Sequence, residues 1–349
     1  MNHGGDIYRN KVDIDFSVNL NPTGIPDDIS EAIKEGVSRA GTYPDSKQES
    51  VKKSIADKEG ISPECVMAGN GASELIFAAV RAIDPRNALL IEPCFSGYRY
   101  ALNSLHNCDI KTYFLKKENG FKLTEGIIDL MDKDIDLIFL CDPWNPTGKN
   151  IDDDLLLSIL DRAKTNDTYV ILDQSFYHLS DKAQNGFDAL AMLKSYDRLI
   201  ILRSMTKIFA LPGIRTGYVM ADKEMITGIK NQLPEWNLSV ISEEVIKAGA
   251  GLLSEKGFID QSLDMIRKER TYLTDELKTL GLNVYESDTT FILIETDHEL
   301  YEELLKRKIL IRDLSNSYGL GRGFYRIAIK DHRSNKILIE IIREIINGH

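Results

Sequence analysis

Short apolar runs alternate with stretches of helical periodicity over the N-terminal part of the chain. The apolar runs lie at residues 66–68, 88–92, 110–115, 137–141, 169–173, 199–203 and 217–220. Helical patterns at residues 72–83, 153–165 and 222–230 lie between them. Several runs are apolar on both faces, which is typical of strands that helices cover on both sides. The pattern therefore predicts a three-layer α/β/α fold with a mainly parallel seven-stranded sheet.

The pattern changes after Pro234. A long helical stretch covers residues 239–280 and is interrupted near Gly257. Further strands are expected at 283–285, 290–295, 309–312 and 325–329, with helices at 298–306 and 333–346. We therefore expect an N-terminal arm (residues 1–30), a large domain (31–235) and a smaller C-terminal α+β domain (236–349).

Composition and charge narrow the class of protein. The 349 residues suffice for one large and one small domain, and the net charge of −11 argues against nucleic acid or an anionic membrane as a partner. The start, MNHGGDIYRNKVD, has no apolar core of a signal peptide, so a cytoplasmic location is expected. Cys65, Cys94, Cys108 and Cys141 form no CxxC pair, which favours buried free thiols and no metal site.

The segment SMTKIFALPGIRTGY (204–218) carries the strongest chemical signal. It directly follows an apolar run, so Ser204, Thr206 and Lys207 lie at the carboxyl end of a strand, where open α/β sheets bind ligands. A lysine there can form an imine with an aldehyde cofactor, and Arg215 with the two hydroxyls suits a phosphate. A single lysine at this place would more simply be solvated. The combination favours a cofactor site.

A second segment, AGNGASELI (68–76), leads from a strand through a glycine turn into a helix. The backbone N–H groups of Gly71, Ala72 and Ser73 can cradle a phosphate at the start of that helix. The pattern is not GxGxxG, so it gives little support for a dinucleotide. A purely structural glycine turn is the alternative.

Two further strand ends carry polar side chains. Asn145 lies in CDPWNPTGK (141–149), where an ordinary proline turn is the alternative. Asp173 lies in VILDQSFYHL (170–179) and ends a buried strand, where an unpaired carboxylate is unfavourable. A protonated ring nitrogen of a cofactor would satisfy it and make the ring a stronger electron sink. A helix N-cap is the alternative for Asp173.

These four segments, taken in their order along the chain, resemble the motifs of fold-type I pyridoxal 5′-phosphate (PLP) enzymes, the aspartate aminotransferase superfamily. The resemblance implies that PLP is held covalently by Lys207, that Asp173 pairs with its ring nitrogen and that Asn145 bonds its phenolate oxygen. It also implies that Phe95, in EPCFSGY, stacks on the ring. Tyr43, in TYPD, resembles the tyrosine that reaches the cofactor phosphate of a neighbouring subunit, so a homodimer with shared active sites is expected.

The chain departs from the family pattern at several positions. Asp142-Pro143-Trp144 stands where the family more often has N-P-N, and Gln174-Ser175 follows Asp173 where most relatives have D-E-A. Phe176 occupies a position where many aminotransferases carry a tyrosine, and Tyr177 follows it.

Residues that bind the substrate decide which reaction PLP carries out. Arg326, in FYRIAIK, matches the family's carboxylate-binding arginine, with a structural salt bridge as the alternative. Arg312, Asn19 and His3 suggest a second anion on the substrate, although a terminal histidine is more often solvated.

This set resembles two branches of the superfamily, the histidinol-phosphate aminotransferases and the L-threonine-O-3-phosphate decarboxylases of cobalamin synthesis. The HGG start, the DFSVNLNPTG segment, Phe176 and the C-terminal ILIR and FYRIAI segments favour the decarboxylase, with Lys207 returning a proton to Cα. L-Serine phosphate is an alternative substrate within the same chemistry. An aminotransferase using 2-oxoglutarate is the second hypothesis, and a PLP-binding domain without turnover is the third.

Overall fold

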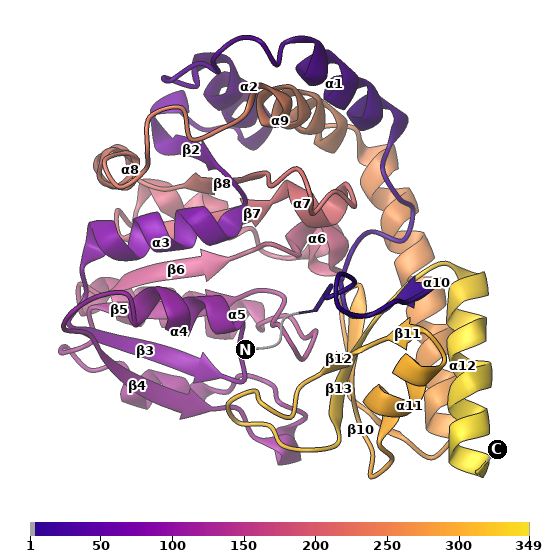
Figure 1. The fold of residues 1–349 in the computed structure, drawn as a ribbon. Helices are drawn as coiled ribbons and strands as arrows, with labels where there is room; N and C mark the ends of the chain where they lie inside the picture. The colour runs from indigo at the N-terminus through magenta and orange to yellow at the C-terminus, as the bar shows by residue number, and fades with distance from the viewer. Residues whose placement is uncertain (1–3, 349) are drawn as a thin grey trace.

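The computed structural model describes residues 4–348 and contains one large and one smaller β-sheet (Figure 1). The large sheet has the strand order β2-β8-β7-β6-β5-β3-β4, and only β8 runs antiparallel to its neighbours. Its strands are β2 (Val66–Gly69), β3 (Asn87–Glu92), β4 (Asp109–Phe114), β5 (Leu137–Cys141), β6 (Tyr169–Asp173), β7 (Leu199–Ser204) and β8 (Gly217–Met220). The predicted mainly parallel seven-stranded sheet is therefore confirmed.

Helices occupy most of the intervals between these strands and follow them toward the C-terminus. They are α1 (Asp27–Ser38), α2 (Glu49–Glu59), α3 (Ala72–Ile83), α4 (Ser96–Leu102), α5 (Asp153–Thr165), α6 (Lys182–Asn185), α7 (Met205–Ile208), α8 (Lys223–Lys230), α9 (Val240–Leu253), α10 (Lys256–Thr279), α11 (Leu300–Lys306) and α12 (His332–Asn347). Short 3₁₀ helices lie at Pro63–Cys65, Lys117–Asn119, Glu125–Leu130, Tyr177–Leu179 and Ala189–Lys194. The predicted interruption of the long helix lies between α9 and α10, just before Gly257.

The smaller sheet has the order β12-β13-β10-β9 and is antiparallel throughout. Its strands are β9 (Asn283–Val284), β10 (Phe291–Glu295), β12 (Arg312–Asp313) and β13 (Phe324–Ala328). The strand expected at 309–312 is divided: β11 (Ile309–Leu310) pairs instead with β1 (Ile14–Asp15) of the N-terminal arm. This parallel pair fixes the arm beside the C-terminal part of the chain, as the indigo segment in Figure 1 shows.

The buried apolar side chains form two clusters. The larger surrounds the seven-stranded sheet, and the smaller joins Phe16 to strands β10 and β13 and helix α12. Helix α9 packs against α1 and α2, and its Val245 and Ile246 belong to the larger cluster. The domain limits at residues 30 and 235 stay a prediction.

The structure bears on two expectations from the sequence, one about membrane-spanning segments and one about the cysteines. Within residues 4–348, no helix is both long and apolar enough to cross a lipid bilayer. The four cysteines are free thiols, but only Cys141 is fully buried and the others are half-buried.

The sequence explains why three chemical segments meet at one place. Strands β5, β6 and β7 consist almost entirely of apolar residues and are buried on both faces. They run parallel and in register, with Cys141 opposite Asp173 and Asp173 opposite Leu202. Their carboxyl ends therefore bring Asn145, Asp173 and Lys207 to the same edge of the sheet.

Candidate active site

A cavity opens at this edge of the sheet, and most of the residues selected from the sequence line it. Its walls come from the N-terminal arm, the starts of α3 and α4, the ends of β5, β6 and β7, and strands β12 and β13. The predicted residues among them are Asn19, Ala72, Ser73, Phe95, Asn145, Asp173, Ser204, Thr206, Lys207, Arg215, Arg312 and Arg326.

Lys207 lies in the single-turn helix α7, directly after β7. Burial, followed by the positive charges of Arg326 and Arg215, lowers the pKa of its ammonium group to about 8. Its Nζ atom lies 5.7 Å from the centroid of the Phe176 ring. The uncharged amine, which is the form that attacks an aldehyde, is therefore available close to neutral pH.

Asp173 is almost completely buried, and each of its carboxylate oxygens accepts a hydrogen bond. The backbone N–H of Ser175 donates to Oδ1 (2.8 Å), and the Tyr98 hydroxyl donates to Oδ2 (2.7 Å). Burial raises the pKa of the Tyr98 hydroxyl well above its usual value, so Tyr98 stays protonated and remains a donor. Because Asp173 lines the cavity, it suits a protonated ring nitrogen there.

Tyr98 also connects Asp173 to the expected stacking ring. Its ring stacks on Phe139 with a centroid distance of 4.7 Å, and it meets Phe95 edge to face at 5.5 Å. Phe95 lines the cavity at the N-cap of α4. The aromatic side chain and the carboxylate that would contact a flat heterocycle are thus held by one shared neighbour.

Donors for a phosphate gather where α3 begins. Gly71 precedes α3 with a φ of +79°, and a Cβ atom on it would lie 2.6 Å from Nη2 of Arg215. A side chain at this position would displace the guanidinium from the helix N-terminus. The hydroxyls of Ser204 and Thr206 lie 2.7 Å apart on the facing strand end. Guanidinium, hydroxyl and backbone donors form a set that fits the phosphate of PLP.

Arg326 crosses the cavity between the two sheets. Its Nη1 donates to Oδ1 of Asn145 (2.6 Å) and its Nη2 to the carbonyl oxygen of Ser17 (2.8 Å). Burial, and then the charge of Arg312, lowers the pKa of Arg326 to about 9. Within residues 4–348, its Nε and the buried Oδ1 of Asn19 have no hydrogen-bond partner. Donors and acceptors are therefore left for a ligand.

Arg312 lies opposite Arg326 on the paired strands β12 and β13. It is half-buried, and no acceptor among residues 4–348 bonds to its guanidinium. A structural salt bridge, the alternative considered for Arg326, is absent for both arginines within the described part of the chain. Both guanidinium groups face the cavity and suit anions.

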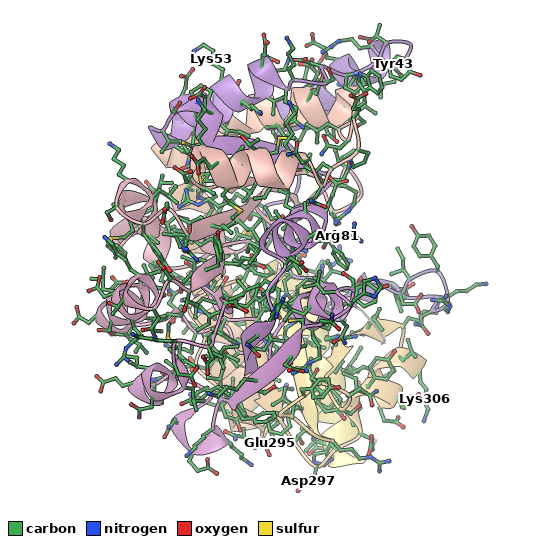
Figure 2. All side chains as sticks on the ribbon, turned by 90° about the vertical axis from the view of Figure 1, so that its left-hand side faces the viewer. Tyr43, Lys53, Arg81, Glu295, Asp297 and Lys306 are labelled. Carbon is green, nitrogen blue, oxygen red and sulfur yellow. The ribbon has the colours of Figure 1, made fainter. Side chains whose placement is uncertain are left out.

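Two of the predicted site residues that lie within residues 4–348, Gly71 and Tyr43, do not line the cavity. Gly71 lies next to it, at the N-cap of α3. Tyr43 lies at the edge of the molecule (Figure 2), where it is 81% exposed and its ring lies 5.3 Å from that of Trp236. His3 lies outside the described residues, so its expected role stays a prediction.

The departures from the family pattern have local explanations. Trp144 is buried and its indole N–H donates to the carbonyl oxygen of Pro93 (2.7 Å), so it joins the turn of Asn145 to the segment before Phe95. Gln174 points away from the cavity, and its Oε1 accepts from Nε of Arg203 at 3.1 Å. Tyr177 also leaves the cavity, because its ring lies under the Arg203 guanidinium at 4.4 Å. Phe176, in contrast, lines the cavity.

The structure adds residues that sequence reasoning missed. Tyr98, Ser175, Ser96 and Ser317 line the cavity but were not singled out. Tyr98 lies three residues after Phe95 on α4, so helical spacing could have placed it on the same face. Ser317 lies in the loop between β12 and β13, where no periodicity marks a residue.

Comparisons with known proteins identify the family of this chain. The model of the family "Aminotransferase class I and II" matches residues 11–342. A threonine-phosphate decarboxylase of Salmonella typhimurium is 30% identical, covering 96% of this chain and 92% of its own. A histidinol-phosphate aminotransferase of Methanosphaera stadtmanae is 26% identical, covering 96% and 91%. The structure of the histidinol-phosphate aminotransferase from Clostridium acetobutylicum superposes with a TM-score of 0.87 at 29% identity, covering 96% of this chain and 100% of that one. The chain belongs to the aminotransferase class I and II family, and its cofactor is PLP.

Proposed function

We propose that this enzyme decarboxylates L-threonine O-3-phosphate, or a close analogue such as L-serine phosphate, to the amino-alcohol phosphate used in cobalamin side-chain synthesis. One observation carries the proposal: two arginines without carboxylate partners, Arg312 and Arg326, face the cavity from directly opposite positions on paired strands. Residues paired in this way have Cβ atoms about 4.5–5.5 Å apart. Such a pair suits a short ligand with two anionic groups.

The two arginines take different groups of this substrate. Arg326 is fixed by Asn145 and Ser17 beside Lys207, so it holds the carboxylate next to the reacting Cα. Arg312 lies farther along the cavity and holds the phosphate, together with the side-chain NH2 group of Asn19, which also lines the cavity and can donate to a phosphate oxygen. His3 is expected to add a donor to the phosphate.

PLP, when bound, supplies the electron sink that accepts the pair of electrons left when the carboxylate departs as CO₂. Asp173 keeps the ring nitrogen protonated, and Phe95 holds the ring plane. Gly71, Ala72, Ser73, Ser204, Thr206 and Arg215 hold the phosphate of the cofactor. Lys207 would hold the cofactor and, with its amine free while substrate is bound, would return a proton to Cα.

Exclusion of water supports decarboxylation over side reactions. Lys207 and Arg326 are strongly desolvated, since burial is the largest cause of both lowered pKa values. In such surroundings, charge interactions with the substrate carboxylate and phosphate are stronger than in water.

A second candidate is an aminotransferase of the histidinol-phosphate type. The superposition on the Clostridium acetobutylicum enzyme favours it, as does the likeness to the Methanosphaera stadtmanae enzyme. In that reaction Lys207 would move a proton from Cα to the cofactor carbon, and 2-oxoglutarate would accept the amino group.

One assay separates these functions. The purified PLP-loaded enzyme is incubated with L-threonine phosphate, with and without 2-oxoglutarate, and CO₂, amine and glutamate are measured. We expect CO₂ and amino-propanol phosphate without any oxo-acid. Glutamate formed only when 2-oxoglutarate is present would identify the aminotransferase instead. No turnover of any phosphorylated amino compound would favour a PLP-binding domain without catalysis.

A homodimer with shared active sites is part of the proposal. Tyr43 is largely exposed and its ring lies tilted against that of Trp236, which is 48% exposed, so an aromatic pair is available to a second subunit. If Tyr43 completes the neighbour's site, mixing Lys207→Ala with Tyr43→Ala protein under subunit exchange restores part of the activity, because one hybrid site is intact. Failure of every such mixture to exceed either variant alone contradicts the shared site.

A further inference from the structure

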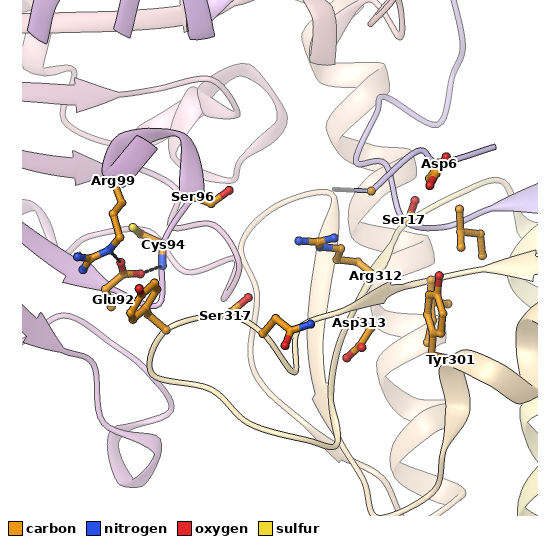
Figure 3. Close-up of a pocket in the computed structure, with 15 residues that line it drawn as sticks. Asp6, Ser17, Glu92, Cys94, Ser96, Arg99, Tyr301, Arg312, Asp313 and Ser317 are labelled. Atoms are coloured by element: carbon orange, nitrogen blue, oxygen red, sulfur yellow. Dashed lines mark hydrogen bonds and ion pairs between the residues drawn. The ribbon is translucent and has the colours of Figure 1, made fainter. Parts of the chain in front are cut away.

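A second cavity adjoins the first at Arg312. It extends past the loop between β12 and β13 toward Arg99 of α4 (Figure 3). The residues that line both cavities are Gly4, Ser17, Cys94, Ser96, Arg312 and Ser317. These residues mark the junction, which a ligand reaching from Lys207 toward Arg312 would enter.

Few side chains at this junction have free donors. The hydroxyl of Ser17 already donates to Asp15 and accepts from the backbone of Gly5. The Cys94 thiol contacts the carbonyl oxygen of Phe95 and is a weak donor in any case. Within residues 4–348, the hydroxyls of Ser96 and Ser317 and the guanidinium of Arg312 have no partner.

The second cavity becomes unfavourable for an anion beyond the junction. Its lining includes the carboxylates of Glu92, Asp313 and Asp6. Arg99 is paired with Glu92 at 3.1 Å and Asp6 with Arg9 at 3.1 Å, whereas Asp313 has no cationic partner among residues 4–348. An anionic group is therefore attracted to the junction by Arg312, while the space behind it offers no unpaired cation and one unpaired carboxylate.

The two serines reach the junction from separate elements. Ser96 begins α4, and Arg99 of the same helix lies over the Tyr318 ring at 4.4 Å. Tyr318 directly follows Ser317, so this contact ties the loop between β12 and β13 to α4. In Figure 3 the guanidinium of Arg312 extends toward the side where Ser96 and Ser317 lie. The three donors thus border one space from separate elements.

We propose that Ser96 and Ser317 are specificity-determining residues that, together with Arg312, bind the phosphate of the substrate at the junction of the two cavities. The inference rests on the proposed function, because it assigns the distal anion of that substrate. Hydroxyl donors and one guanidinium match the several acceptor oxygens of a phosphate monoester. The absence of an unpaired cation beyond the junction, within the described lining, disfavours ligands that carry their second anion farther from Cα.

Binding to the holoenzyme tests this assignment. The dissociation constants of L-threonine phosphate and unphosphorylated L-threonine are measured from the initial absorbance change of the bound cofactor on mixing. We expect Ser96→Ala and Ser317→Ala each to weaken L-threonine phosphate about 10-fold, since a hydrogen bond to a charged group is lost. Binding of L-threonine should not change. Ser104→Ala, whose hydroxyl bonds to the carbonyl oxygen of Ala101 and lines neither cavity, is the matched control.

A charge substitution gives a second, independent measurement. Ser317→Asp places a negative charge beside Arg312, so it should weaken L-threonine phosphate and inorganic phosphate, used as a competitor, far more than it weakens L-threonine. Equal losses for L-threonine and its phosphate in these variants, or no loss in either alanine variant, would overturn the assignment.

These outcomes are distinct from failure of the proposed reaction, because binding is observed before any turnover. An enzyme that releases no CO₂ but loses selectivity for the phosphate in the serine variants would retain this site and refute the decarboxylase. An enzyme that releases CO₂, but whose serine variants keep their selectivity for the phosphate, would support the decarboxylase and refute this site.

Discussion

Arg312 and Arg326 face each other across the antiparallel strands β12 and β13, and within residues 4–348 neither guanidinium has a carboxylate partner. Like charges directly opposite on neighbouring strands are destabilising. The repulsion is visible at Arg326, because the charge of Arg312 helps to lower the pKa of its guanidinium. A structure that keeps such a pair at a cavity is suited to a dianionic ligand, which relieves the repulsion.

Replacement of each arginine should therefore affect different substrates. We expect Arg312→Ala to reduce kcat/KM for L-threonine phosphate by about 100-fold, because a charge-assisted contact to the phosphate is lost, with little effect on binding of L-threonine. Arg326→Ala should weaken both amino acids, since both carry the carboxylate. Steady-state kinetics and the cofactor absorbance change measure these effects. If Arg312→Ala weakens the two ligands equally, Arg312 does not bind the phosphate.

The repulsion between Arg312 and Arg326 should also affect the free energy of unfolding of the ligand-free enzyme. In the enzyme free of substrate, Arg312→Ala should leave the free energy of unfolding unchanged or raise it, since a half-buried, unpaired charge is removed. Denaturant titration gives this value. A clear loss of stability would show that Arg312 has a structural role instead.

Gly71 allows Arg215 to approach the start of α3. In Gly71→Ala the new Cβ would lie 2.6 Å from Nη2 of Arg215, so the guanidinium must move and cofactor binding should weaken about 10-fold. With φ +79° and ψ 166°, Gly71 lies in a backbone region that is essentially restricted to glycine, so any other residue there adds strain of about 1–3 kcal/mol. Equilibrium titration of the apoenzyme with PLP measures the affinity.

Gly60 provides a control for substitution of a glycine with positive φ. It has φ +69° and ψ 33°, the left-handed helical conformation, and a Cβ atom there would meet no neighbouring atom within 4 Å. Gly60→Ala should therefore lose some stability, about 1–2 kcal/mol, and keep its affinity for PLP. Equal loss of affinity in both variants would mean that backbone strain, and not the position of Arg215, weakens the cofactor.

The lowered pKa of Lys207 determines how capture of the cofactor depends on pH. The apoenzyme attacks the PLP aldehyde with the uncharged amine, so its rate should rise with pH, with a midpoint near 8, and then level off. If Lys207 had the ordinary lysine pKa of 10.5, the rate would still be rising with pH above 8. Because the charge of Arg326 lowers this pKa, Arg326→Ala should move the midpoint to higher pH. Stopped-flow absorbance measures the rate, and the exposed Arg162→Ala is the control. An unmoved midpoint in Arg326→Ala would show that the charge of Arg326 does not contribute to the shift.

The same pKa has a consequence for stability. The folded pKa of about 8 lies below the unfolded value of 10.5, so between these pH values the unfolded chain binds a proton that the folded chain lacks. Lys207 should therefore make the apoenzyme more stable as pH rises through this window, and Lys207→Met should remove this increase. The difference in free energy of unfolding between the two proteins at pH 7.5 and pH 10 measures it. Lys207→Met should also abolish the absorbance band of the covalently bound cofactor.

The sequence was informative wherever local pattern and tertiary structure agree. Strands β5, β6 and β7 are continuous apolar runs, so their existence and their shared edge followed directly, and with them the positions of Asp173 and Lys207. The segment at 309–312 shows the limit. It was one apolar run, but β11 pairs with the N-terminal arm while β12 pairs with β13, and only tertiary contacts decide that division.

Side-chain partners were the least predictable part of the site. The motif around Asn145 identified a turn, but not that Trp144 would bond to Pro93. Ser317 lies in a loop whose position depends on the contact between Tyr318 and Arg99, two residues far apart in sequence. No periodicity or motif encodes such a contact, so Ser96 and Ser317 became visible only when the two sheets were placed together.

Tyr98 holds Asp173 through one buried hydrogen bond, and Tyr98→Phe removes that bond while keeping the stacked ring. Because the acceptor is a buried carboxylate, we expect the apoenzyme to lose about 1.5–3 kcal/mol of unfolding free energy. Tyr113→Phe, which removes a half-buried bond of 2.8 Å to the Thr124 hydroxyl, should lose only about 1 kcal/mol. Denaturant titration compares them. The cofactor band of Tyr98→Phe should also change its pH dependence, because Asp173, which we propose pairs with the ring nitrogen, keeps only the Ser175 N–H as a donor. A Tyr98→Phe enzyme with the stability and the cofactor titration of the wild type would show that Asp173 is held without Tyr98.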